Sequence, residues 1–150
     1  MFAPKNILVP TDFSEYSGQA FKKALDIAKL HSSGIFLLHI IDGTMQQFVT
    51  DYCFDSKILE RVVSESIIRS NENLQKMVEK SPESKGVKII TDVRRGVPFE
   101  EILKTQQEQE IDLIVMAFHG RTGLKINPIG SVTERVTRGA GCTVLLVKND

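Results

Sequence analysis

Near the N-terminus the chain reads Asn6-Ile7-Leu8-Val9-Pro10-Thr11-Asp12. The run from Ile7 to Val9 is continuously aliphatic, and a polar segment follows it at once. A strand that is covered on both faces gives such a continuous run, whereas a strand with one solvated face alternates between apolar and polar residues. This stretch therefore predicts a buried parallel strand whose carboxyl end opens into a loop that carries Thr11 and Asp12.

Similar aliphatic runs recur along the chain. They lie at residues 35–41, 87–93, 113–116 and 143–147, and amphipathic helical patterns separate them at 14–31, 57–79, 98–109 and 131–139. Strands that alternate with helices predict a doubly wound parallel sheet with helices on both faces. We expect one α/β domain over residues 1–150, with five strands in the order 3-2-1-4-5; the flavodoxin-like order 2-1-3-4-5 is the alternative.

Composition narrows the function classes. The chain has 19 Lys and Arg against 19 Asp and Glu, so it has no overall charge to attract nucleic acid or an anionic membrane. No apolar run approaches the roughly 20 residues of a membrane-spanning helix, and the first residues lack the pattern of a secretory signal. Cys53 and Cys142 lie far apart without metal-type spacing. We expect a cytoplasmic protein with reduced thiols and neither nucleic-acid nor membrane partners.

Polar and small residues gather after the first and fourth predicted strands. In sheets of this type the ligand lies outside the carboxyl ends of the strands. After the fourth strand, Gly120 and Gly123 permit tight turns, and Gly130 and Ser131 open a helix whose N-terminus suits phosphate. Ser131 and Glu134 have the spacing of a capping box. Asp12 after the first strand has two interpretations: it could hold ribose or a metal ion, or it could cap the first helix together with Glu15, which we favour from the pattern alone.

Other candidates are weaker. His39 lies within an apolar strand and is interpreted as a core histidine, whereas His119 is a candidate for contact with an anion. Arg94 and Arg95, after the third strand, could meet a phosphate or simply end the strand. The irregular stretch 42–56 is longer than a routine connection, which suggests a lid, an interface element or a mobile segment.

Taken together, these stretches resemble the universal stress protein family. The resemblance also covers Leu38-His39-Ile40-Ile41-Asp42, Gly96-Val97-Pro98 and Asp112-Leu113-Ile114-Val115-Met116. Members that bind ATP carry the pattern G-x2-G-x9-G-(S/T). Here Gly120, nine residues and then Gly130-Ser131 match it, while Ala117 stands at the first glycine. A methyl group there could crowd a phosphate, or be harmless where the backbone keeps a negative φ.

The resemblance implies an adenine-nucleotide α-hydrolase-like fold and a regulatory protein of the stress response that binds ATP, ADP or AMP, with Mg²⁺ or Mn²⁺ accompanying ATP. It implies a homodimer through the last strand, 143–147. It also implies a binding site without catalytic residues and with no assigned metal ligands. The implied nucleotide-binding residues are Pro10, Thr11, Asp12, Ile40, Met116, Gly120, Arg121, Gly130, Ser131, Val132 and Thr133.

Three alternatives remain open at this point. An ATP-using enzyme or slow hydrolase would rely on Asp12, His119 and Arg121, but the P-loop pattern is missing. A phospho-receiver or flavodoxin would need clustered carboxylates or a hydroxyl-rich loop at strand ends where this chain has neither. A nucleotide-free dimer that acts only through protein contacts is compatible with Ala117.

Overall fold

The computed structural model describes residues 1–43, 51–52, 55–119 and 129–149. Its elements, in chain order, are β1 (Asn6–Pro10), α1 (Glu15–His31), β2 (Gly34–Asp42), α3 (Ser56–Glu79), the 3-10 turn η1 (Pro82–Ser84), β3 (Ile89–Gly96), α4 (Pro98–Glu108), β4 (Leu113–Ala117), α5 (Ser131–Gly139) and β5 (Thr143–Val147). Every predicted strand and helix is present. The third strand starts two residues later than predicted and runs on to Gly96, because it pairs with β2 as far as Asp42.

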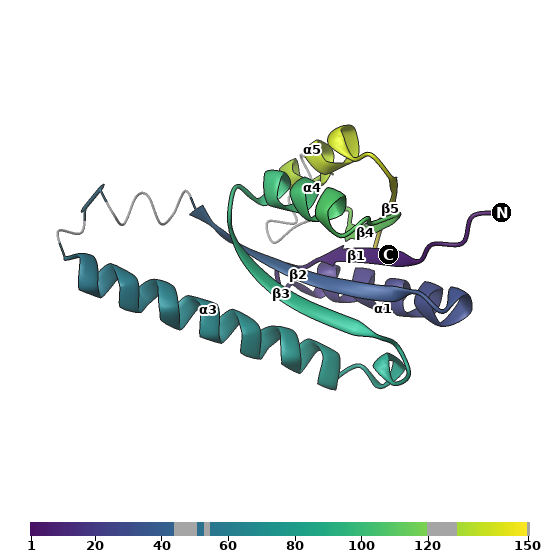
Figure 1. The fold of residues 1–150 in the computed structure, drawn as a ribbon, viewed down its shortest axis with the longest axis horizontal. Helices are drawn as coiled ribbons and strands as arrows, with labels where there is room; N and C mark the ends of the chain where they lie inside the picture. Colours follow the sequence, from purple (N-terminus) through teal and green to yellow (C-terminus); the bar gives the residue numbers. More distant parts are fainter. Residues whose placement is uncertain (44–50, 53–54, 120–128, 150) are drawn as a thin grey trace.

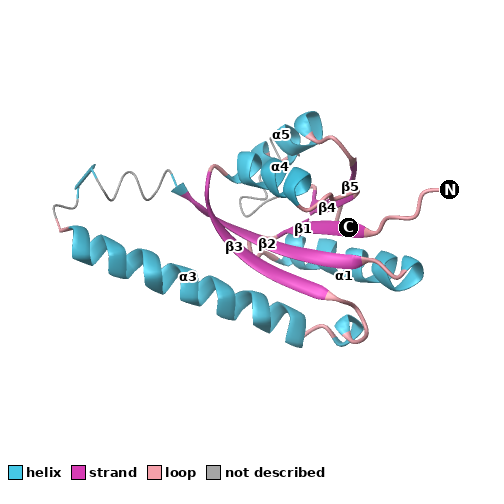
Figure 2. Cartoon of the chain, viewed as in Figure 1, coloured by secondary structure: helices cyan, strands magenta, loops and turns pink. Residues whose placement is uncertain are grey.

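The five strands form one parallel sheet in the order β3-β2-β1-β4-β5, which confirms the predicted 3-2-1-4-5 arrangement. The helices form two layers. Helices α1 and α3 lie on one side of the sheet, and α4 and α5 lie on the other (Figures 1 and 2). Strand β1 is therefore central, with β2 and β4 as its neighbours.

The aliphatic residues of β1 pack against the helices on both faces of the sheet. Ile7 and Val9 belong to the cluster that α1 and α3 cover, while Leu8 belongs to the cluster that α4 and α5 cover. All three side chains are fully buried. Successive residues of a strand point to opposite faces, so burial on both faces demands an apolar residue at every position.

Two predicted helix caps are wrong. The N-cap of α1 is Ser14, whose side chain accepts a hydrogen bond from the Ser17 N–H; Asp12 instead accepts one from the Ser14 N–H, at 3.0 Å, in the turn before the helix. The N-cap of α5 is Gly130, and it makes no side-chain cap bond. Ser131 is the first residue of that helix, so Ser131 and Glu134 cannot form the reciprocal pair of a capping box.

Helix α3 is held to the sheet mainly through its C-terminal half. Among its 24 residues only Ser70 and Leu74 are buried, and both lie beyond its midpoint. The large apolar side chains of Ile58 and Val62, in the N-terminal half, are 52% and 50% exposed. In Figure 1 that half extends past the end of the sheet. Within the described residues, no helix is both long and apolar enough to cross a membrane. The predicted irregular stretch 42–56 falls largely outside the described residues.

Candidate functional site

A cavity of about 450 Å³ opens at the carboxyl edge of the sheet. Its walls come from the ends of β1, β2 and β4 and from the first turns of α4 and α5. In a sheet of order 3-2-1-4-5 the chain leaves β1 toward one edge and reaches β4 from the other side, so a crevice forms between these two strands. A volume of this size falls in the range of small-molecule sites.

The predicted site residues that the structure describes all line this cavity. They are Pro10, Thr11, Asp12, Ile40, Met116, Gly130, Ser131, Val132 and Thr133. Gly120 and Arg121 lie outside the described residues, so the structure does not place them. Segments that are more than 100 residues apart in the chain thus share one hollow, as the edge rule for parallel sheets predicts.

The loop after β1 is held by a small hydroxyl network. The Thr11 hydroxyl lies 2.9 Å from the Ser17 hydroxyl and accepts a hydrogen bond of 3.0 Å from the Phe13 N–H. Phe13 has a φ of 65°, a left-handed conformation that is uncommon for a bulky residue. Its ring packs against His39, with the ring centroids 4.4 Å apart. The bond and the ring contact together fix this strained loop beside the cavity.

His39 is not the core histidine that the sequence suggested: it is half-buried and lines the cavity, although its ring is held by the backbone. Its Nδ1 lies 2.8 Å from the carbonyl oxygen of Thr11, which joins β2 to the loop after β1. His119 also lines the cavity, near the rings of Tyr16 and Phe118. The cavity therefore has one histidine engaged with the backbone of the β1 loop and another at its β4 side.

The opposite wall is the N-terminus of α5. The N–H groups of the first helical turn have no partner within the helix, and the helix dipole makes this end electropositive. Thr133 donates a hydrogen bond of 3.0 Å from its buried hydroxyl to the carbonyl oxygen of Ala117, which fixes α5 against the end of β4. Ala117 lies within β4 and is not among the residues with positive φ. The backbone at this position therefore does not require glycine, and only the methyl group distinguishes it.

Several residues of the cavity wall are not among the predicted site residues. Pro98 and Ile102 line the cavity from α4, and Ser17, Leu38 and Asp42 complete it. Pro98 lies two residues after the carboxyl end of β3, so the edge rule applied to the third strand would have found it. Ser17 lies in the first turn of α1 and Ile102 one turn inside α4, and which face of a helix meets a cavity depends on tertiary packing.

Arg94 lies within β3, and not after it as predicted, and its side chain is held by carboxylates. Its guanidinium donates hydrogen bonds to Asp92 and Glu108, and it does not line the cavity. Burial by itself would lower the pKa of Arg94, but the hydrogen bonds and charges of Asp92 and Glu108 raise it, so the group stays cationic. Arg95 is exposed on the neighbouring position of the strand.

Two other polar features bear on the chemistry of the chain. Cys142 is a free thiol, and burial, together with the negative charge of Asp112, raises its pKa. In the part of the chain that the structure describes, no three His, Cys, Asp or Glu side chains are grouped as a metal site. Asp12 and Asp42 are the carboxylates of the cavity wall.

Known proteins resemble this chain over almost its whole length. The universal stress protein family model matches residues 4–148. Universal stress protein MJ0531 of Methanocaldococcus jannaschii is 37% identical over 144 residues, which cover 96% of this chain and 82% of that protein. The solved structure of MJ0577, from the same organism, superposes with a TM-score of 0.80 at 34% identity and covers 99% of each chain.

Two more distant structures have the same fold. One is a universal stress protein in complex with cAMP, with a TM-score of 0.68, 20% identity and coverage of 97% of this chain and 98% of that one. The other is the universal stress protein from Archaeoglobus fulgidus in complex with dAMP, with a TM-score of 0.59, 18% identity and coverage of 98% and 100%. The extent of the family match and the identity to its archaeal members lead to one conclusion: this chain belongs to the universal stress protein family.

Proposed function

We propose that this protein is a cytoplasmic adenine-nucleotide-binding regulatory protein of the stress response. The observation that carries the proposal is the composition of the cavity, where an apolar wall, a carboxylate and a helix N-terminus surround one hollow. Each suits a different part of a nucleotide. The two distant relatives that were solved with cAMP and dAMP support an adenine nucleotide over other ligands.

The nucleotide would lie across the cavity in a defined direction. Pro10, Ile40 and Met116 offer apolar surface for the base. Asp12 offers a carboxylate for the ribose hydroxyls, while the first turn of α5 offers N–H groups for phosphate. The reverse orientation would set phosphates beside Asp12 and Asp42, where like charges repel. Gly120 and Arg121 complete the proposed site from the loop after β4.

A divalent ion would accompany the triphosphate. Phosphate oxygens are ligands that Mg²⁺ and Mn²⁺ prefer, so the ion would be held mainly by the triphosphate itself, while Asp12 serves the ribose. Binding, and not turnover, is the proposed role. Slow ATP hydrolysis is the alternative, and ADP formation followed over a day in the binding samples would distinguish it.

Isothermal titration calorimetry with ATP, ADP and AMP, with and without Mg²⁺, tests the proposal on protein first checked by mass spectrometry for co-purified nucleotide. We expect saturable binding that Gly130→Val weakens at least about tenfold, because an isopropyl group at the N-cap blocks approach to the helix N-terminus. Gly141→Val, beyond the other end of α5 and with ordinary space around an added Cβ, is the matched control and should bind normally. A folded, nucleotide-free protein that binds none of the three would contradict the proposal and favour a role in protein contacts alone.

We also propose that the protein is a homodimer through β5. This strand forms one edge of the sheet, and Leu145 on it is 37% exposed despite its size. An edge strand offers unpaired backbone groups to a second copy of itself. Light scattering after gel filtration should give twice the mass of the chain, and Leu145→Lys should give the monomer mass. A monomeric wild-type protein at high concentration would refute the dimer.

A further inference from the structure

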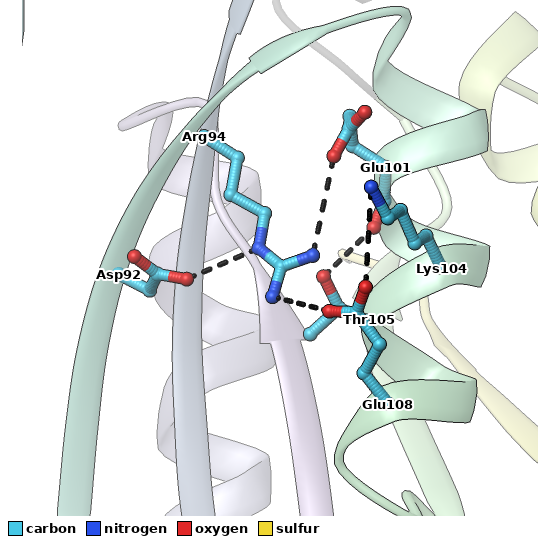
Figure 3. Close-up of polar contacts among 6 residues, drawn as sticks. All are labelled: Asp92, Arg94, Glu101, Lys104, Thr105 and Glu108. Carbon is cyan, nitrogen blue, oxygen red and sulfur yellow. Dashed lines mark hydrogen bonds and ion pairs between the residues drawn. The ribbon is translucent and has the colours of Figure 1, made fainter.

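Arg94 is the centre of an ion-pair cluster that joins a strand to a helix. From β3 its Nε lies 3.1 Å from Asp92 Oδ2, its Nη2 lies 2.9 Å from Glu108 Oε2, and its Nη1 lies 4.0 Å from Glu101 Oε2. The Arg94 side chain is 19% exposed. Figure 3 draws the guanidinium between Asp92 on the strand and the two glutamates on α4. Because Glu101 and Glu108 are two turns apart, the cluster holds the helix along much of its length.

The cluster differs from an ordinary surface ion pair. Lys104 and Glu108 also form a pair, at 3.9 Å, but the Lys104 side chain is 62% exposed. Such exposed pairs contribute little. Arg94 instead donates hydrogen bonds to two carboxylates, Asp92 and Glu108, from a partly buried position, and Glu101 adds a longer contact; the planar fork specifies both distance and orientation.

The strand position of Arg94 links the cluster to the cavity. Arg94 is the register partner of Ile40, and Gly96 is the register partner of Asp42. Ile40 and Asp42 line the cavity from β2. On the other side of the cluster, α4 contributes Pro98 and Ile102 to the same wall. The Arg94 cluster therefore lies behind the place where the strand part and the helix part of the wall meet.

The turn between β3 and α4 packs against Glu101, one of the carboxylates of the Arg94 cluster. Gly96 has a φ of 149°, and a Cβ added there would lie 3.0 Å from both Cγ and Oε1 of Glu101. Glu101 also donates its backbone N–H to the carbonyl oxygen of Val97. Glu101 thus packs against the turn that leads into Pro98, which lines the cavity.

We propose that Arg94 is a positioning residue for nucleotide binding: by holding Glu101 and Glu108 it fixes α4 against β2 and β3, and so sets the position of the Pro98 and Ile102 wall. This inference rests on the proposed function. A direct contact between Arg94 and the nucleotide is the rival that the geometry disfavours, because three carboxylates surround the guanidinium and would repel phosphate.

The first test does not involve the ligand. Hydrogen exchange of the nucleotide-free Arg94→Gln variant should become at least about tenfold faster at the backbone amides of α4, while α1 and α5 keep wild-type rates, since a helix opens more readily once its tertiary contacts are lost. Arg95→Gln is the matched control, because it removes the same charge one residue away on the exposed side of the strand. Arg94→Lys should recover only part of the protection, since an ammonium cannot present the same fork. Unchanged exchange in α4 would overturn the proposal.

The second test separates positioning from simple loss of charge. If Arg94 acts by positioning the Pro98 and Ile102 wall, Arg94→Gln should weaken the binding of AMP, ADP and ATP by the same factor, about threefold to tenfold. All three nucleotides share the adenosine part that contacts this wall. A long-range charge effect would instead grow with the number of phosphates, would shrink at high salt and would appear in Arg95→Gln as well. That graded pattern would overturn the proposal.

A variant that removes only one ion pair disturbs the structure less than the loss of Arg94. Glu108→Gln removes the shortest ion pair but leaves Arg94 in place, and should give the same pattern at smaller amplitude. If the wild-type protein binds no adenine nucleotide, the proposed function fails. Faster exchange in α4 of Arg94→Gln would then still establish the cluster as the device that fixes this wall, while unchanged exchange would refute it.

Discussion

The hydroxyl groups of Thr11 and Ser17 lie 2.9 Å apart, and this contact joins the loop after β1 to the first turn of α1. Both residues are buried. Thr11→Val keeps the shape of the side chain but leaves the Phe13 N–H without its acceptor and removes one hydrogen bond of Ser17, whose hydroxyl still donates to the Ser14 carbonyl oxygen. Leaving a buried polar group unpaired costs about 1–3 kcal/mol, so we expect the free energy of unfolding in urea to fall by about that amount.

A double-mutant cycle makes this prediction specific. Thr11→Val, Ser17→Ala and the double variant should show a coupling of at least about 0.5 kcal/mol, because the second change removes a partner that the first has already lost. Additive losses would mean that the two hydroxyls do not act together.

Leu74 and Ile58 lie on the same helix in very different surroundings. Leu74 is fully buried against the core, whereas Ile58 is 52% exposed. Leu74→Ala should lower the free energy of unfolding by about 2–5 kcal/mol through lost burial and the cavity that remains. Ile58→Ala should change it by no more than about 0.5 kcal/mol. Equal losses in urea denaturation would show that the N-terminal half of α3 is packed as tightly as the rest.

The raised pKa of Cys142 predicts a pH dependence of stability. Burial, and then the charge of Asp112, disfavours the thiolate in the folded protein. A free thiol in the unfolded chain titrates near about 8.5. The contribution of Cys142 is therefore fully present below that pH and is lost as the pH rises through the folded pKa, because the unfolded chain releases its proton first.

Urea denaturation between pH 7 and pH 10 measures this contribution. The fall in stability with rising pH should be steeper for the wild type than for Cys142→Ala, which has no thiol at this position. Asp112→Asn should give an intermediate slope, since it removes one of the two causes of the raised pKa. Parallel curves for wild type and Cys142→Ala would contradict the assignment.

Much of the fold was predictable because its elements have local signals. The aliphatic run from Ile7 to Val9 identifies a strand covered on both faces, and Pro98 marks the first turn of a helix. The rule that ligands lie at the carboxyl ends of parallel strands predicted a crevice beside Thr11 and Asp12, and both residues line the cavity. The order of the strands was less firmly predictable, because the alternation of strands and helices also allows the order 2-1-3-4-5.

The failures come from choices that a sequence pattern does not encode. Ser14 and Asp12 both suit an N-cap, and the start of α1 decides between them. The spacing of Ser131 and Glu134 fits a capping box, but the helix begins one residue too early for it. For Arg94 the pattern offered a phosphate contact or the end of a strand, and neither includes the ion-pair cluster, because the carboxylate partners on α4 come near only through packing.

The place of β1 at the middle of the sheet has a consequence for how the protein is made. β1 precedes the other four strands in the chain, and its pairing with β2 needs only the next few dozen residues. Its other partner, through Ile7 with Leu113 and Leu8 with Ile114, comes more than 100 residues later. Closing so distant a pair is slow. One side of the central strand therefore stays open until β4 has been made, and an unpaired strand edge is prone to aggregation during that interval.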